Sequence, residues 1–241
     1  MPISENWTPV SGLLHWEAVQ PDKAFLTQPR SGEAQDYTWA QTADQVRRMA
    51  SYLQSLELPA GSRIGLVSSN CAHCVMADLA IWMAGHVSLP IYPSLNADTL
   101  AYILEHSEAS LLFLGPLSSW GTMQSGVPES MPIVRFPGAP EVDQQRAVQN
   151  WDALLAEQPP MKSFVPRAPN ELARLMYTSG STGQPKGVMV PFVALEVAGG
   201  LLNSVVEITP EDRQLSYLPL AHAFESAVVL SSALRWGYQV F

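Results

Sequence analysis

The chain has 241 residues, of which 47% are hydrophobic and only 15% are charged. This composition excludes an intrinsically disordered chain and supplies enough apolar surface for one or two folded domains. A formal net charge of −9 argues against nucleic-acid binding, which depends on Lys and Arg side chains that neutralise phosphates.

The N-terminus lacks the basic, apolar and small-residue pattern of a secretory leader. The two long uncharged runs, 79–97 and 109–128, are interrupted by Gly and Pro, so neither resembles a membrane span. We therefore expect a cytoplasmic protein without a transmembrane segment, and peripheral membrane contact stays open.

The two cysteines of the chain, Cys71 and Cys74, form a C-x-x-C pair. This spacing is typical of a redox pair or of half a zinc site. No second cysteine pair or H-x-x-x-H motif supplies the remaining ligands of a tetrahedral site. We expect two reduced thiols in a helix.

Helical and strand patterns alternate through the first half of the chain. A capping box at Thr38-Trp39-Ala40-Gln41 predicts a helix start, and Asn70 and Asn96 are expected to cap two later helices. The expected helices are 11–16, a helix from 38 to about 57, 70–84 and 96–106, and the expected strands are 23–28, 63–68, 87–92 and 110–114. Such alternation with continuous apolar strands predicts an α/β fold with a mostly parallel sheet and helices on both faces.

The second half is less regular. Residues 120–169 are rich in proline and are expected to form a surface excursion with a strand at 131–136 and a helix at 151–156. After it we expect strands at 172–178 and 188–190, a helix at 192–206, a strand that ends at Pro219, a helix at 224–236 and a final strand at 237–241.

A stretch of small and hydroxylated residues lies between two of these apolar strands. Its glycines allow a close backbone approach to a ligand, its backbone N–H groups can form an anion nest, and Lys186 adds a cation. The pattern indicates a polyphosphate site made of Thr178, Ser179, Gly180, Ser181, Thr182, Gly183 and Lys186. Because Gln184 and Pro185 precede Lys186, the loop differs from the common nucleotide-triphosphate loop and is expected to join two strands. The alternative is a Gly/Ser-rich surface linker.

Residues 177–187 resemble the phosphate-loop signature of the adenylate-forming superfamily, which includes acyl-CoA synthetases, luciferases and peptide-synthetase adenylation domains. Eleven consecutive positions fit. One departure is Pro191-Phe192, where many members have Thr-His. Segments 89–93 and 100–104 also resemble the opening of the superfamily's large N-terminal domain.

A second informative stretch runs from 215 to 225 and contains His222. Parallel sheets place ligand sites beyond the carboxyl ends of their strands, so Thr178 and His222 are expected to converge on one crevice. The alternative makes His222 a helix-capping residue beside a core Phe224. The stretch is similar to the acyl-pocket motif of long-chain acyl-CoA synthetases, which implies that His222 and Phe224 shape the carboxylate pocket. Glu225 stays open between a site role and a first-turn acid favoured by the helix dipole.

The resemblance implies a ligase that joins a carboxylic acid to a thiol in two half-reactions. The apolar segment 217–225 favours a long-chain fatty acid as this substrate. ATP and the acid give acyl-AMP, and CoA then takes the acyl group. Backbone amides of 179–183 would hold the β- and γ-phosphates, Thr178 would contact phosphate and Mg²⁺, and Lys186 would neutralise the triphosphate. Lys186, His222 and Thr178 are thus the candidate catalytic residues.

Several parts of the superfamily pattern do not occur in this sequence: the aromatic-Gly-Thr-Glu segment, the ribose-binding aspartate, the hinge and the terminal domain with its catalytic lysine. The resemblance therefore implies that residues 1–241 are an incomplete N-terminal part of an AMP-binding domain, without the second half of the large domain and the C-terminal lid. We expect this part to bind ATP weakly and to be inactive alone. The alternatives are a fatty acyl-AMP ligase, another acid-activating domain, or a non-catalytic nucleotide-binding module.

Overall fold

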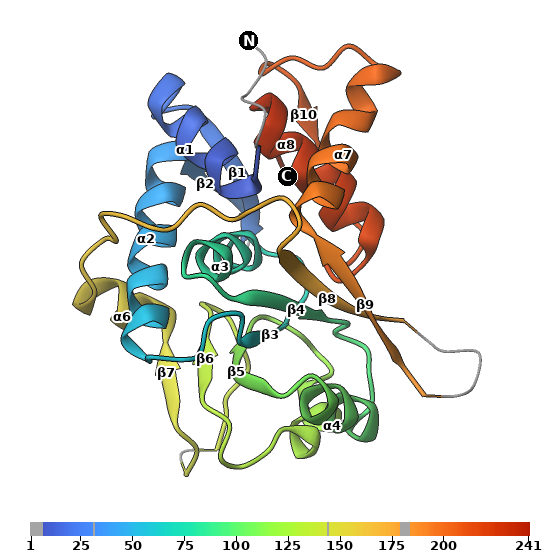
Figure 1. Ribbon diagram of the computed structural model, residues 1–241. Coiled ribbons are helices and arrows are strands. Elements are labelled where there is room, and N and C mark those ends of the chain that lie inside the picture. The colour runs from blue at the N-terminus through green and yellow to red at the C-terminus, as the bar shows by residue number, and fades with distance from the viewer. Residues whose placement is uncertain (1–6, 31, 144, 179–183) are drawn as a thin grey trace.

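The computed structural model describes residues 7–30, 32–143, 145–178 and 184–241. Within this part of the chain, a seven-stranded sheet has the order β7-β6-β5-β3-β4-β8-β9, and a four-stranded sheet has the order β10-β11-β1-β2 (Figure 1). The strands are β1 Ala24–Arg30, β2 Glu33–Thr38, β3 Arg63–Val67, β4 Val87–Ile91, β5 Ala109–Leu114, β6 Ile133–Arg135, β7 Val148–Asn150, β8 Leu172–Thr178, β9 Lys186–Pro191, β10 Arg213–Gln214 and β11 Gln239–Val240.

Helices lie on both sides of the large sheet, with α3 on one side and α4 on the other (Figure 1). The α-helices are α1 Pro9–Val19, α2 Trp39–Ser55, α3 Ala72–Met83, α4 Ala97–His106, α5 Trp120–Met123, α6 Trp151–Glu157, α7 Phe192–Leu201 and α8 Ser231–Trp236. Short 3₁₀ turns occupy η1 Gln124–Gly126 and η2 Leu202–Ser204, and η3 Phe224–Leu230 is π-helical. No helix of the described residues is long and apolar enough to cross a membrane.

The strands of the large sheet run parallel from β7 to β8, and β9 returns antiparallel beside β8. Successive residues of β5 belong to different clusters of the core: Leu111 and Phe113 pack on one face, Leu112 and Leu114 on the other. Because strand side chains alternate between faces, both faces of the sheet are buried. The predicted fold class, a mostly parallel sheet covered on both sides, is confirmed.

Helix capping agrees with the sequence at two of three positions. Thr38 and Gln41 form the predicted capping box of α2, and the Asn96 side chain accepts a hydrogen bond from the Thr99 N–H at the start of α4. The prediction for Asn70 is wrong, because α3 begins one residue later, with Cys71 as its N-cap. The Gln28 side chain of β1 accepts a hydrogen bond from the Ala72 N–H at 3.0 Å and so satisfies one backbone donor in the first turn of α3.

Other differences concern segments near the second sheet. The strand expected to end at Pro219 is absent, since β10 covers only Arg213–Gln214 and residues 215–219 lie outside every described strand. The helix after β9 ends at Leu201 and continues as the 3₁₀ turn 202–204, short of the expected residue 206. Strands β2 and β7 are missing from the sequence prediction. Most side chains of both strands are exposed, so neither strand has a readable apolar pattern.

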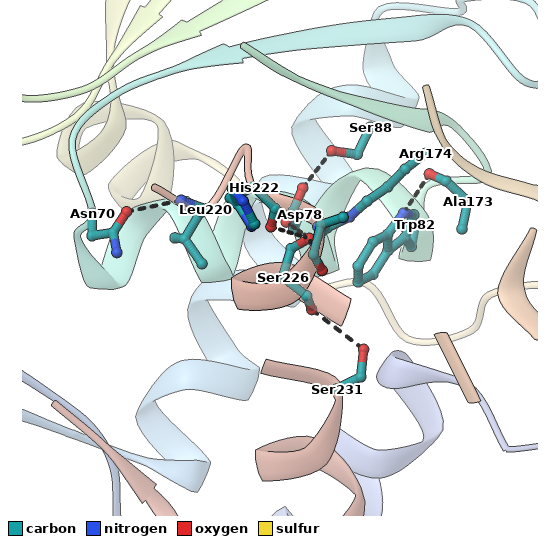
Figure 2. A network of polar contacts seen from close by, with 11 residues as sticks. Asn70, Asp78, Trp82, Ser88, Ala173, Arg174, Leu220, His222, Ser226 and Ser231 are labelled. Carbon is teal, nitrogen blue, oxygen red and sulfur yellow. Dashed lines mark hydrogen bonds and ion pairs between the residues drawn. The ribbon is translucent and has the colours of Figure 1, made fainter. Parts of the chain in front are cut away.

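A buried ion pair joins β8 to α3 (Figure 2). Arg174 of β8 is fully buried, and its guanidinium donates to the Asp78 carboxylate of α3. Ser88 of β4, which pairs in register with Arg174, donates to the same carboxylate. The guanidinium also lies 5.0 Å from the centroid of the Trp82 ring, and the Trp82 indole donates to the Ala173 carbonyl at 2.8 Å.

We predict that Asp78→Ala lowers the free energy of unfolding by about 3–5 kcal/mol, because it leaves the buried Arg174 charge uncompensated. Urea unfolding of the 241-residue chain measures the change. Asp44→Ala is the matched control: Asp44 pairs with Arg48 at 2.8 Å on the exposed side of α2, and its loss is expected to cost about 0.3–0.5 kcal/mol. Adding Arg174→Met to Asp78→Ala should recover part of the loss. Equal costs for Asp78→Ala and Asp44→Ala would contradict the prediction.

Candidate functional site

The carboxyl ends of the parallel strands meet at one edge of the large sheet, where α/β proteins place their ligand sites. Three strands there are direct neighbours in the order β3-β4-β8. Asn70 follows β3, Tyr92 follows β4, and Thr178 is the last residue of β8. The residues that the sequence singles out are distributed along this edge.

The β8–β9 hairpin brings two predicted site residues together. Thr178 is the register partner of Lys186 across the antiparallel pair, and both residues are exposed. Directly opposite residues of an antiparallel pair project from the same face, with their Cβ atoms about 5 Å apart. A hydroxyl and an ammonium group therefore share one face at the base of the connection between the strands. The connection itself, Ser179, Gly180, Ser181, Thr182 and Gly183, lies outside the described residues.

A cavity of about 560 Å³ opens beside the hairpin, at the carboxyl ends of β4 and β8. Thr178 and Pro185 line it from the hairpin, and Tyr92 lines it from the neighbouring strand end. Its described lining is otherwise mostly apolar and comes from β4, Leu95, α4 and Tyr177 of β8. Lys186 and His222 are not among its described lining residues.

Tyr177 forms part of the cavity wall and is fixed by α4. Its hydroxyl lies 2.6 Å from Nδ1 of His106, and the His106 ring stacks on Tyr102. Burial raises the pKa of Tyr177, so the phenol stays protonated near neutral pH. This contact locks the residue that directly precedes Thr178.

Asn70 holds the segment 216–220 to the end of β3, in an arrangement that we call the Asn70 clamp. Its Nδ2 donates to the Leu218 carbonyl at 2.7 Å and to the Ser216 hydroxyl at 3.0 Å. Its Oδ1 accepts from the Leu220 N–H at 2.9 Å (Figure 2). The Ser216 N–H still donates to the Phe241 carbonyl at 2.7 Å, and beyond Ser216 the Asn70 contacts hold the segment that the sequence predicted as a strand.

His222 follows the clamp and is exposed. Its Nδ1 accepts from the Phe224 N–H at 3.2 Å, the first N–H of η3, whose N-cap residue is Ala223. Phe224 is 49% exposed and is not a core aromatic residue. His222 thus contacts the helix start without being its N-cap, and the alternative of a core position for Phe224 is wrong. The pocket role of the two residues stays a prediction.

Glu225 is fully buried and connects η3 to the clamped segment. Its Oε2 accepts from the Leu218 N–H at 3.3 Å, and its Oε1 has no hydrogen-bond partner among the described residues. The contact helps to fix the bend between 218 and 225.

Thr178 and His222 lie at the same edge of the sheet. Strands β3 and β8 flank β4, so their ends are about 10 Å apart. The Asn70 clamp places the segment before His222 at the β3 end, and Thr178 is at the β8 end. No contact between described residues joins Thr178 to His222, and their convergence on one crevice stays a prediction.

The described residues offer few metal donors at this edge. No group of three or more His, Cys, Asp or Glu side chains in the described ranges is placed to hold a metal ion. The Thr178 hydroxyl is an oxygen donor of the kind that Mg²⁺ accepts when phosphates and water complete its coordination.

Sequence reasoning missed the groups that position the site. Arg174 and Asp78 are single charges within apolar runs, which is a readable signal for a buried pair. The sequence around Asn70 indicates a helix cap and gives no sign of its contacts with 216–220. The Tyr177–His106 contact joins residues that are 71 positions apart and left no local signal.

The family model for the AMP-binding enzymes matches residues 13–241. The chain belongs to the AMP-binding enzyme family. Among curated relatives of this family member, fatty acyl-CoA synthetase A of Dictyostelium discoideum is 34% identical over 212 residues, which cover 82% of this chain and 32% of that protein. A long-chain-fatty-acid–CoA ligase of Mycobacterium bovis is 30% identical over 241 residues, which cover 95% of this chain and 39% of that ligase. The chain thus spans about a third of the length of these relatives.

Solved structures share the fold of this AMP-binding family member. The anthranilate CoA ligase AuaEII, crystallised with anthranoyl-AMP, superposes with a TM-score of 0.86 and 20% identity, over 99% of this chain and 45% of that one. The N-terminal domain of FACL13 from Mycobacterium tuberculosis superposes with a TM-score of 0.79 and 22% identity, over 97% of this chain and 56% of that one. Both likenesses extend across the two sheets.

We predict that Asn70→Ala releases the segment 216–222, because two hydrogen bonds to its backbone and one to Ser216 are lost. The cost is expected to be about 1–3 kcal/mol of unfolding free energy. Amide hydrogen exchange should rise at least tenfold in peptides that cover 216–222. Asn96→Ala is the control, since it removes the α4 cap at a cost of about 1 kcal/mol and should leave exchange in 216–222 unchanged. Equal protection of 216–222 in both variants would contradict the clamp.

Proposed function

We propose that the complete protein activates a long-chain fatty acid with ATP to acyl-AMP and then transfers the acyl group to CoA. The observation that carries the proposal is the register pairing of Thr178 with Lys186 at the base of the glycine-rich connection. Membership of the AMP-binding enzyme family supports the adenylation step. The named activities of two curated relatives, a fatty acyl-CoA synthetase and a long-chain-fatty-acid–CoA ligase, support the choice of acid and acceptor.

The phosphate side of the proposed site is the β8–β9 hairpin. Lys186 neutralises charge on the triphosphate, and the backbone amides of Ser179, Gly180, Ser181, Thr182 and Gly183 hold its terminal phosphates. Thr178 contributes its hydroxyl to phosphate and would hold Mg²⁺, which supplies charge neutralisation when bound. The carboxylate of the acid attacks the α-phosphorus of the anionic triphosphate and pyrophosphate leaves, so fixed positive groups at this hairpin lower the barrier without a nucleophilic side chain.

The acyl side of the proposed site is the segment that the Asn70 clamp holds. His222 and Phe224 shape the pocket for the carboxylate, and exposed apolar side chains accompany them at Leu215 and Tyr217. An exposed apolar surface next to a clamped turn suits the burial of an aliphatic chain. The cytoplasmic location is part of the same proposal.

The 241-residue chain should bind Mg-ATP weakly, and Lys186→Ala should weaken this binding about tenfold, a change of about 1.4 kcal/mol. Isothermal titration calorimetry measures both dissociation constants. Lys162→Ala is the matched control, because Lys162 is also exposed but lies outside every helix and strand, remote in sequence from the hairpin. An equal affinity for Lys186→Ala and Lys162→Ala would remove Lys186 from the phosphate site.

Pyrophosphate exchange tests the reaction. The complete protein should exchange pyrophosphate in the presence of a long-chain fatty acid, and Lys186→Ala should slow acyl-adenylate formation about 100-fold. Residues 1–241 alone should show no exchange. Stimulation by an aromatic acid but not by a long-chain fatty acid would contradict the proposed substrate, and an unchanged rate in Lys186→Ala would contradict the proposed mechanism.

A further inference from the structure

The C-x-x-C pair has the geometry of a dithiol close to disulfide formation. Cys71 is the N-cap of α3 with extended backbone, and Cys74 lies in the first turn of this helix, where its N–H donates to the Cys71 carbonyl at 3.0 Å. Both thiols are free, and their sulfur atoms are 3.3 Å apart. A disulfide bond requires about 2.05 Å, so the two sulfurs need to approach by about 1.3 Å. Cys71 precedes the helix rather than lying in it as expected, and the reduced state of the two thiols stays a prediction.

The two thiols differ in their access to small molecules. Cys71 lines a cavity of about 170 Å³ between β1, the start of α3 and the segment 215–220. Cys74 is not among the described residues that line this cavity, and it is only 1% exposed. Cys71 is also buried, with 7% exposure, but it lines the cavity, so a small reagent that enters the cavity meets Cys71 before Cys74.

The two thiols also differ in acidity, and Cys71, which lines the cavity, is the more acidic of the two. The Cys74 thiol next to the Cys71 sulfur lowers the pKa of Cys71 well below its usual value; burial opposes this shift, and His73 and Ser68 add to it. Burial raises the pKa of Cys74 well above its usual value. Since the thiolate is the reactive form, Cys71 is the better nucleophile of the two.

We propose that Cys71 and Cys74 are a redox-active dithiol in which Cys71 attacks a small-molecule disulfide and Cys74 resolves the product. The Cys71 thiolate attacks one sulfur of the disulfide, a mixed disulfide forms, and one small thiolate leaves. The Cys74 thiol then attacks the Cys71 sulfur and expels the second small thiolate, which takes up the proton that Cys74 loses. The net reaction converts two protein thiols and one disulfide into one protein disulfide and two small thiols, so atoms and electrons balance.

This site does not depend on the proposed adenylation activity. None of the residues assigned to phosphate or acid binding takes part in the exchange. The disulfide would form directly beside Asn70, whose side chain holds the segment 216–220.

Oxidised glutathione is the probe for the test. The reduced 241-residue chain is incubated with it under native conditions, quenched with acid, unfolded and treated with N-ethylmaleimide, and its mass is then measured. We expect a chain that has lost two hydrogens and carries no maleimide. A folded chain that keeps two alkylatable thiols, under conditions that oxidise the urea-unfolded chain, would overturn the proposal because burial would then protect the pair.

Two serine variants test the assigned order of attack. Cys74→Ser should stop at the mixed disulfide and gain the mass of one glutathionyl group on Cys71. Cys71→Ser should react with oxidised glutathione at least tenfold more slowly. Far-ultraviolet circular dichroism checks that both variants fold, and the result for the unchanged chain stands if either does not. Equal or reversed rates for the two variants would overturn the roles of Cys71 and Cys74.

Discussion

The buried ion pair between Arg174 and Asp78 is the constraint on which the position of β8 depends. Burial raises the pKa of Asp78 and lowers the pKa of Arg174, so desolvation opposes the charge on both partners. Two guanidinium nitrogens of Arg174, Nε and Nη1, have no hydrogen-bond partner in the described structure. Such a pair adds little net stability, but separation of its partners is costly. It therefore ties β8 to α3, and the end of β8 carries Thr178.

A second constraint acts at the other end of the candidate site. The Asn70 clamp fixes residues 216–220 to the end of β3, and Glu225 ties the following helix to the same segment. The proposed phosphate side thus rests on β8, and the proposed acyl side rests on β3, with β4 between them. Because neighbouring strands keep a nearly constant spacing, the sheet itself sets the distance between the two sides.

Local sequence patterns predicted most of the elements, because each depends on neighbouring residues. The Thr38 capping box, the Asn96 cap and the strands that bracket the glycine-rich stretch are of this kind. The predictions of a cap at Asn70 and of a strand before Pro219 fail because this region depends on contacts between residues far apart in the sequence. Asn70 contacts residues 146 to 150 positions away, and these contacts satisfy backbone groups that the sequence assigned to a strand. Likewise, only the tertiary structure shows that Arg174 meets Asp78 inside the core.

The two interpretations of His222 are compatible, because the ring has two nitrogens. A neutral histidine that accepts the Phe224 N–H at Nδ1 must carry its proton on Nε2. This hydrogen bond therefore fixes the tautomer and leaves Nε2–H as a donor on an exposed side chain. Under the proposed function, this N–H suits a carboxylate oxygen of the acid, since a charged acceptor strengthens the hydrogen bond.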